Sequence, residues 1–420
     1  MPPPYFRRPR RFVCMKPAGS LVGALISAIV PIFAAAGGVL ALGACASCQS
    51  TVRVAAMPVV AAGSFDGVVA DPNTHRLYMA DRSAKGVDVV DISASTPRFM
   101  ATVNLGAMPS GLALASDRNR LFVAVEGGKV AVIDTSSARV IDTIALNASG
   151  ADLLDYSPQT QRVYAGTGDG GEVVTIDATT DKVRLRLAAK APVGQPRYDP
   201  AEGMLYVTTP KSDSLLQINP ATGNITRTYV IPKCGPAGVA INPTRQLAML
   251  ACGSSVGLLN LLTGAHSVTR VVQGGGDIVS YDATSDRFVL ASPHGGSDSA
   301  VGVFSGSGEF IGSVAAAPKA HAAAYDTAHG LVYAPGNDGL MSFAPADCAP
   351  PPDWLKFLGG LSIFAVPMFV LILVPVLYAR RLRRARDPSK PTFRDLVRED
   401  LEAERERMRA LEDGILGLEP

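Results

Sequence analysis

The stretch DPAEGMLYVTTPKSDSLLQINPATG, residues 199–223, carries the pattern that decides the fold. Asp199-Pro200 precedes the run Leu205-Tyr206-Val207-Thr208-Thr209, and a later turn begins at Asn219-Pro220. Asp and Asn side chains cap turns, and proline presets φ. Short runs rich in Val, Thr and aromatic residues, bounded by such turns, are typical of strands. The stretch therefore predicts strands joined by tight polar turns.

The pattern recurs seven times along the chain. Each copy has an apolar or aromatic pair after a turn, and the second members of the pairs are 41 to 44 residues apart. One repeat reads as four strands, at 67–70, 76–80, 87–91 and 99–104. Four strands in each repeat of this length are typical of one β-propeller blade. The pairs are Leu77-Tyr78, Leu121-Phe122, Val163-Tyr164, Leu205-Tyr206, Leu247-Ala248, Phe288-Val289 and Val332-Tyr333.

The last repeat lacks a fourth strand. Residues 320–325, 331–334 and 340–343 supply three strands before a proline-rich stretch. Residues 51–60 read as an unpaired strand before the first repeat, and pairing them beside 340–343 closes the ring. Closure removes two exposed sheet edges that an open solenoid would keep. The sequence therefore predicts an all-β fold, a closed seven-bladed propeller.

Several of these motifs resemble a known family. The run Leu205-Tyr206-Val207-Thr208 is similar to the tetrapeptide that names the YVTN-repeat propellers. The run from Cys234 through Ile241-Asn242-Pro243 to Cys252 also resembles YncE-like members. The similarity covers roughly residues 52–345 and implies the fold strongly. It implies little about function, because propellers carry many activities.

Two charge-free segments, 21–42 and 357–378, are long enough to cross a bilayer. Basic residues precede the first, and five arginines between 380 and 386 follow the second. The positive-inside rule therefore places both chain ends in the cytoplasm and the repeats outside it. The first segment is either a signal peptide or a retained anchor. We expect a bacterial inner-membrane protein with a periplasmic propeller, crossing the membrane once or twice.

The chain thus divides into five parts. They are a signal peptide or anchor (1–50), the propeller (51–347), a proline-rich linker (348–356), one transmembrane helix (357–378) and a charged cytoplasmic tail (379–420). In the tail, Thr392 is suited to cap a helix that runs to about Asp413. A short heptad-like stripe on that helix is compatible with an interfacial helix or a coiled coil.

Cysteines outside the cytoplasm are expected to form disulfides. Cys234 enters a blade and Cys252 ends the second strand of the same blade, so both lie on one face and we expect them to pair. Cys48 precedes the closing strand and Cys348 follows its partner strand, so this pair would clamp the ring. The alternative is free buried thiols. Cys45 ends a lipobox-like Leu-Gly-Ala-Cys string and is a candidate for lipidation, or for replacing Cys48 in the disulfide if no lipid is attached.

Candidate ligand residues lie where the chain enters each blade. The seven positions read Asp66, Ser110, Asp152, Gly194, Ala237, Asp277 and His321. Carboxylates and a histidine that converge on the central opening are able to hold a divalent cation or a polar ligand. The alternative is that they cap loop amides. His294 lies in a neighbouring loop and is a further candidate.

Several activities are excluded or weakened by what the sequence lacks. The net charge of +2 gives no basic surface for nucleic acid, and residues 51–344 hold 22 basic and 25 acidic residues. No Cys-x-x-Cys-His motif or recurrent tryptophan is present. We therefore expect no cofactor beyond a divalent cation, and a propeller that binds a protein or small ligand on the face turned away from the membrane. The alternative is a lactonase-like, metal-dependent hydrolase that uses Asp66, Asp152, Asp277 and His321.

Overall fold

The computed structural model describes residue 48, residues 52–270, residue 276, and residues 278–292, 299–337, 339–348 and 393–415. The chain separates into two compact units. One comprises Leu42–Pro351, and the other comprises Met1–Ala41 with Pro352–Pro420. The described residues of the larger unit form the propeller, and those of the other unit form one helix.

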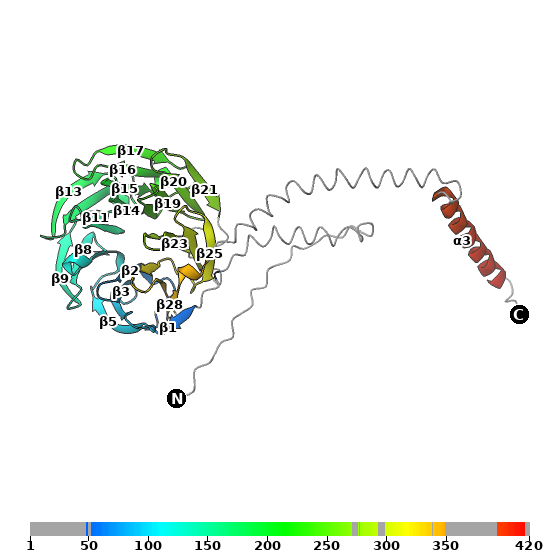
Figure 1. Ribbon diagram of the computed structural model, residues 1–420, viewed down its shortest axis with the longest axis horizontal. Coiled ribbons are helices and arrows are strands. Elements are labelled where there is room, and N and C mark those ends of the chain that lie inside the picture. The colour runs from blue at the N-terminus through cyan, green and yellow to red at the C-terminus, as the bar shows by residue number, and fades with distance from the viewer. Residues whose placement is uncertain are drawn as a thin grey trace, which may run out of the picture. The chain divides into compact units, whose positions relative to one another are not determined.

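The described part of the larger unit folds into seven four-stranded antiparallel sheets. Figure 1 shows them arranged as blades around a centre, with first strands such as β14 inside and fourth strands such as β5, β13 and β17 at the rim. The seven predicted repeats therefore correspond to seven blades. Blade 1 contains β2 (Phe65–Asp71), β3 (Arg76–Asp81), β4 (Gly86–Asp91) and β5 (Arg98–Asn104); blade 2 contains β6 (Pro109–Ala115), β7 (Arg120–Val125), β8 (Lys129–Asp134) and β9 (Arg139–Ala145); and blade 3 contains β10 (Leu154–Ser157), β11 (Arg162–Gly166), β12 (Glu172–Asp177) and β13 (Lys182–Ala188). Blade 4 contains β14 (Pro196–Asp199), β15 (Met204–Thr209), β16 (Ser214–Ile218) and β17 (Ile225–Val230); blade 5 contains β18 (Val239–Asn242), β19 (Leu247–Cys252), β20 (Ser255–Asn260) and β21 (His266–Arg270); and blade 6 contains β22 (Val279–Asp282), β23 (Arg287–Ser292), β24 (Ala300–Ser305) and β25 (Phe310–Ala315). Blade 7 contains β26 (Ala324–Asp326), β27 (Leu331–Gly336) and β28 (Gly339–Phe343), and its fourth strand is β1 (Arg53–Ala55). Short 3-10 turns are η2 (Ser116–Arg118), η3 (Gly168–Gly170), η4 (Pro210–Ser212) and η5 (Pro345–Asp347).

The ring closes through the strand before the first blade. Strand β1 pairs antiparallel with β28, with Val54 opposite Met341. The pairing was predicted, but the strand is shorter than the expected 51–60 and ends at Ala55. Pro58 has no N–H to donate to a ladder, which is consistent with this early end.

The first strand of blade 7 also differs from the prediction. It begins at Ala324 rather than at Ala320. The Ala320 N–H donates to the carbonyl oxygen of Ala317 at 3.1 Å, so this residue closes a turn instead of entering the sheet.

The repeated aromatic residues form the core between blades. Tyr78, Tyr164, Tyr206 and Tyr333 have no more than 1% of their surface exposed. Tyr78 packs with Leu121 of the next blade, so the second strands hold neighbouring blades together.

The predicted turn chemistry is also present. Asp71 accepts hydrogen bonds from the Asn73 N–H at 3.1 Å and the Thr74 hydroxyl at 2.8 Å. Asp199 and Asp326 accept from the backbone N–H two residues on. These carboxylates fold the turn between the first and second strands.

Both expected disulfides are present in the structure. Cys48 bonds to Cys348 across 300 residues, and Cys234 bonds to Cys252 across 18 residues. The first joins the chain before β1 to the chain after β28, which is the closure point of the ring. Cys45 lies outside the described residues.

The other unit contains α3 (Phe393–Ile415), close to the tail helix expected up to about Asp413. Val397, Leu401 and Met408 on this helix are exposed. No helix among the described residues is long and apolar enough to span a membrane. The segments 21–42 and 357–378, for which membrane insertion is expected, lie outside the described residues.

Candidate functional site

The antiparallel blades divide their loops between two faces. We call the face with the loops into each first strand, and between the second and third strands, the blade-start face. The opposite face carries the loops between the first and second strands and is called the turn face. Of the candidate ligand residues, Asp66, Asp152 and His321 lie on the blade-start face. Asp277 and His294 are outside the described residues.

Asp66 and His321 meet on this face although they are 255 residues apart. The Nε2 atom of His321 lies 3.0 Å from Asp66 Oδ1, and Arg82 Nη1 lies 2.7 Å from Asp66 Oδ2. Asp66 and His321 side chains are only 15% and 16% exposed. The contact joins blade 7 to blade 1, so it lies at the closure of the ring.

The charge state of this cluster follows from its hydrogen bonds. Burial alone would raise the pKa of Asp66, but the hydrogen bond and charge of His321, and then Arg82, outweigh burial and hold that pKa below its usual value. The other nitrogen of His321, Nδ1, lies 3.0 Å from the carbonyl oxygen of Lys319. Both ring nitrogens therefore face acceptors, and only the imidazolium donates from both.

The other blade-start positions mainly connect neighbouring first strands. The Ser110 hydroxyl lies 3.2 Å from the carbonyl oxygens of Ala151 and Asp152, and the Gly111 N–H donates to Asp152 O at 3.0 Å. A Cβ atom on Gly194 would lie 2.6 Å from the carbonyl oxygen of Ala237. These positions hold adjacent blades in register through backbone carbonyl oxygens.

A groove opens beside these blade-start positions, across blades 1 to 3. Its volume is about 460 Å³, and it is formed by loops that lead into blades 2 and 3 and by loops between second and third strands. Ser110 and Asp152 were expected here, whereas Arg82, Glu126 and Asp169 were missed. The remaining lining residues are Met108, Pro109, Gly127, Ser149, Gly150, Ala151, Thr167 and Gly168.

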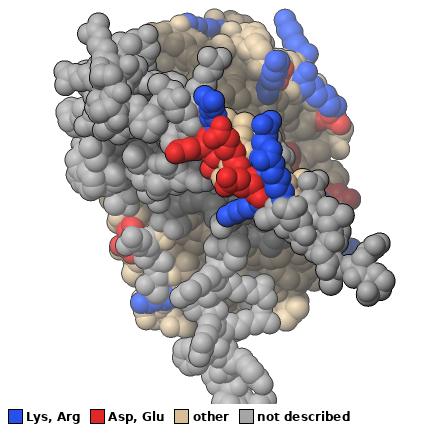
Figure 2. All heavy atoms as spheres, turned by 90° about the vertical axis from the view of Figure 1, so that its right-hand side faces the viewer, with Lys and Arg blue, Asp and Glu red and all other residues tan. Residues whose placement is uncertain are grey.

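The groove is acidic overall. It contains the carboxylates of Glu126, Asp152 and Asp169 and a single guanidinium, that of Arg82. Lys211 forms an exposed ion pair with Asp169 at 2.9 Å, and this hydrogen bond lowers the pKa of Asp169. Figure 2 shows acidic and basic side chains of described residues in mixed groups in that view. The groove therefore favours a ligand with positive charge.

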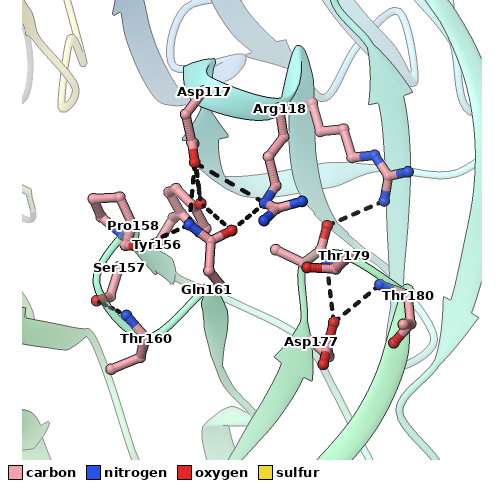
Figure 3. A network of polar contacts seen from close by, with 12 residues as sticks. Asp117, Arg118, Tyr156, Ser157, Pro158, Thr160, Gln161, Asp177, Thr179 and Thr180 are labelled. Carbon is pink, nitrogen blue, oxygen red and sulfur yellow. Dashed lines mark hydrogen bonds and ion pairs between the residues drawn. The ribbon is translucent and has the colours of Figure 1, made fainter.

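The turn face is tied together by a polar network of its own (Figure 3). The Tyr156 hydroxyl lies 3.0 Å from both Asp117 carboxylate oxygens, and Gln161 Nε2 donates to Asp117 at 3.2 Å. Arg118 donates in turn to the Gln161 side-chain oxygen. Burial and the hydrogen bond to Asp117 raise the pKa of Tyr156. The network links the turns of blades 2 and 3, so its role is structural.

The hydrolase alternative requires a cation held by Asp66, Asp152, Asp277 and His321, and Asp277 lies outside the described residues. In the structure Asp66 forms ion pairs with His321 and Arg82. Within the described ranges, no group of three or more His, Cys, Asp or Glu side chains is placed to hold a metal ion.

The fold and the groove define a class of protein: a closed, seven-bladed propeller with a polar groove on one face. A family model described as "Outer membrane protein assembly factor BamB" matches residues 150–321. Among solved structures, hydrazine synthase of Kuenenia stuttgartiensis is similar, with a TM-score of 0.58, 13% identity, and coverage of 68% of this chain and 96% of that one. At this identity the likeness supports the fold alone.

Curated relatives carry the name "Uncharacterized protein YncE". The Salmonella typhi protein is 26% identical over 170 residues, 39% of this chain and 48% of the relative. The Escherichia coli K12 protein is 26% identical over 126 residues, 29% of this chain and 36% of the relative. The chain thus spans about half or less of the length of the curated relatives it matches. In the matched parts the chain is similar to YncE, and its seven blades agree with a YncE-like propeller.

Proposed function

We propose that this chain is a membrane-anchored, extracytoplasmic propeller that acts as a binding module. The acidic groove on the blade-start face carries the proposal, because it is concave, polar and assembled from three blades. Its ligand is a protein segment or small molecule with positive charge. The absence of a metal-ligand group from the described residues gives no support to the hydrolase alternative.

The anchoring part of the proposal is supported by sequence. The segments 21–42 and 357–378 are charge-free and flanked by basic residues at their cytoplasmic ends. The two disulfides favour an oxidising compartment such as the bacterial periplasm. The tail that contains α3 then lies in the cytoplasm. Reporter fusions after Pro391 test this topology, and a periplasmic signal there would contradict it.

The closure disulfide gives the proposed orientation. Cys348 follows β28 and Cys48 precedes β1, so both chain ends leave the propeller at the loop position between a third and a fourth strand. This position belongs to the turn face. The turn face is then directed to the membrane, and the blade-start face with its groove is directed away from it.

Charge reversal in the groove tests the binding role. Glu126 and Asp169 are exposed and line the groove, so Glu126→Arg with Asp169→Arg removes its negative character. Asp142→Arg, an exposed position on the outer strand β9, is the matched control. Partners are captured by crosslinking of the full chain in native membranes, followed by purification in detergent.

The expected result is a reproducible partner that is lost with the double variant and retained with the control. Loss of two charged contacts lowers binding by about 10- to 100-fold. Retention of every partner by the double variant would refute the groove as the binding surface. An equal loss with Asp142→Arg would show that net charge, rather than the groove, controls binding.

A further inference from the structure

The first strands of the blades surround a central cavity of about 300 Å³. Apolar side chains from several blades line part of it, among them Val68, Leu112, Leu153 and Ile278, beside a somewhat larger share of polar atoms. The volume is at the lower end of the range for ligand pockets. This cavity is separate from the groove on the blade-start face, and the two share no lining residue.

Blade 4 supplies polar side chains to this cavity. Gln195 and Arg197 are two residues apart on the first-strand segment, so their side chains share one side of the strand. The corresponding residues of most other blades are apolar or glycine. The repeat pattern does not require polar groups at these two positions.

Gln195 is 97% buried, with 3% of its surface exposed. Its Oε1 atom accepts a hydrogen bond from the Val239 N–H at 2.8 Å. Because a backbone N–H only donates, this contact identifies the oxygen and leaves Nε2 as the remaining atom. Among the described residues, Gln195 Nε2 has no hydrogen-bond partner. One of the side chains that line the cavity therefore carries a neutral donor without a partner.

Arg197, in contrast, is already paired. Its Nη1 atom lies 2.7 Å from Asp155 Oδ1, and its Nε donates to the carbonyl oxygen of Val239 at 3.3 Å. The second oxygen of Asp155 accepts from the Tyr198 N–H at 2.7 Å. The positive and negative charges therefore offset each other. An anionic ligand would be desolvated beside Asp155 without a net opposite charge, which is unfavourable.

We propose that the central cavity binds a small neutral molecule whose carbonyl or amide oxygen accepts a hydrogen bond from Gln195 Nε2 and whose apolar body packs against the first strands. The amide of Gln195 is held in place by Val239, so the donor is oriented before the ligand arrives. This binding is independent of the groove and of the cationic partner proposed for it.

The test uses a neutral probe and its anionic counterpart. ¹⁹F NMR line broadening of 4-fluorobenzamide and 4-fluorobenzoate is recorded with the purified full chain in detergent, with detergent alone as the blank. A probe of this size with ordinary ligand efficiency has a Kd of about 1 mM. We expect saturable binding of the amide, displacement by unlabelled benzamide, and weaker binding of the benzoate.

Three variants locate the site. Gln195→Glu, at a pH where its carboxyl is ionised, keeps an acceptor for Val239 but removes the donor, and we expect binding of the amide to weaken by about tenfold. Leu153→Trp fills the cavity from blade 3 and is expected to abolish binding. Ser280→Ala is the control, because the Ser280 hydroxyl already donates to the Ala323 carbonyl oxygen at 3.0 Å, and binding should persist.

Cooperative thermal unfolding near the wild-type temperature establishes that each variant is folded. If Gln195→Glu does not fold, Leu153→Trp decides the location of the probe. The proposal is overturned by a lack of saturable amide binding, by unchanged binding in Gln195→Glu or in Leu153→Trp, or by benzoate binding as strong as that of the amide.

Discussion

The two disulfides are expected to differ in their contribution to stability, because they close loops of very different length. A crosslink restricts the unfolded chain more when it closes a longer loop. For the 300-residue separation of Cys48 and Cys348 the loop-closure relation gives about 6 kcal/mol, and for the 18-residue separation of Cys234 and Cys252 it gives about 3 kcal/mol. The closure disulfide should therefore be the more stabilising by about 2–3 kcal/mol.

The native contacts where the ring closes also indicate that the Cys48–Cys348 disulfide is the more stabilising of the two. Strand β1 has three residues and pairs with β28 at the rim of blade 7. Without the crosslink, this short ladder must hold the end of a long chain segment by itself. The Cys234–Cys252 disulfide lies within blade 5, where four complete strands remain paired when it is removed.

The assay compares two double variants, Cys48→Ala with Cys348→Ala and Cys234→Ala with Cys252→Ala. Each removes two sulfur atoms and leaves no unpaired thiol of the pair, so the packing losses are similar. Guanidinium unfolding of the full chain, followed by far-ultraviolet circular dichroism, measures the free energy of unfolding. A loss in the Cys234/Cys252 variant that equals or exceeds the loss in the Cys48/Cys348 variant would refute the reasoning.

Three further changes test individual contacts. Asp66→Asn removes the charge that His321 and Arg82 hold, and should lower the free energy of unfolding by about 1–3 kcal/mol at pH 7. Since the pKa of Asp66 is lowered in the fold, the stability that this carboxylate contributes is present above the usual pKa of 3.8 and is lost as the pH falls below it. The difference in free energy of unfolding between the variant and wild type should therefore shrink in acid unfolding curves. Burial raises the pKa of Asp88 to about 6, so the free energy of unfolding should fall as the pH rises from about 4 to about 6. Asp88→Asn should be more stable than wild type at pH 7 by up to about 3 kcal/mol. Equal melting temperatures at pH 4 and pH 7 in both proteins would contradict this. Gly111→Ala places a Cβ 2.5 Å from the carbonyl oxygen of Asp152, and we expect a loss of about 1–3 kcal/mol in chemical unfolding, with an unchanged stability counting against the close packing of blades 2 and 3.

Much of the architecture was predictable because a propeller is periodic. Most repeats place a turn-forming Asp, Asn or Ser before a strand-forming run at the same interval, so the same local pattern is present several times along the chain. The boundaries were less predictable. Strand β26 begins at Ala324 and β1 ends at Ala55, because a backbone turn at Ala320 and a proline at 58 limit the ladders.

The disulfides were predictable for a topological reason. Once four antiparallel strands form each blade, the face on which every loop lies is determined, and Cys234 and Cys252 fall on one face. Closure by a strand from the N-terminal side then brings Cys48 to Cys348.

The candidate site was predicted only in part. Asp66 and His321 meet because closure brings blade 7 beside blade 1, but Ser110 bonds to backbone atoms of the next blade. Arg82, Glu126 and Asp169 were missed. A sequence signal for them existed, since they lie in loops between second and third strands, which share the blade-start face.

Gln195 and Arg197 were missed for a different reason. Their signal was two polar side chains, two residues apart, in a first strand whose counterparts are mostly apolar. Whether the polar atoms of such residues find partners in another blade, or remain without a hydrogen bond in the central cavity, depends on distances between blades. The repeat pattern does not encode these distances.

The sequence by itself determined the number of blades, the strand at which the ring closes and the pairing of the cysteines, because these depend on periodicity and connectivity. Only the tertiary structure decided that Asp66 and His321 form an ion pair, that loops of three blades enclose an acidic groove, and that Gln195 has an unused donor in the central cavity. These contacts join residues of different blades, and their distances depend on how closely the blades pack around the ring. Periodicity determines which face a side chain lies on, whereas packing determines what it touches.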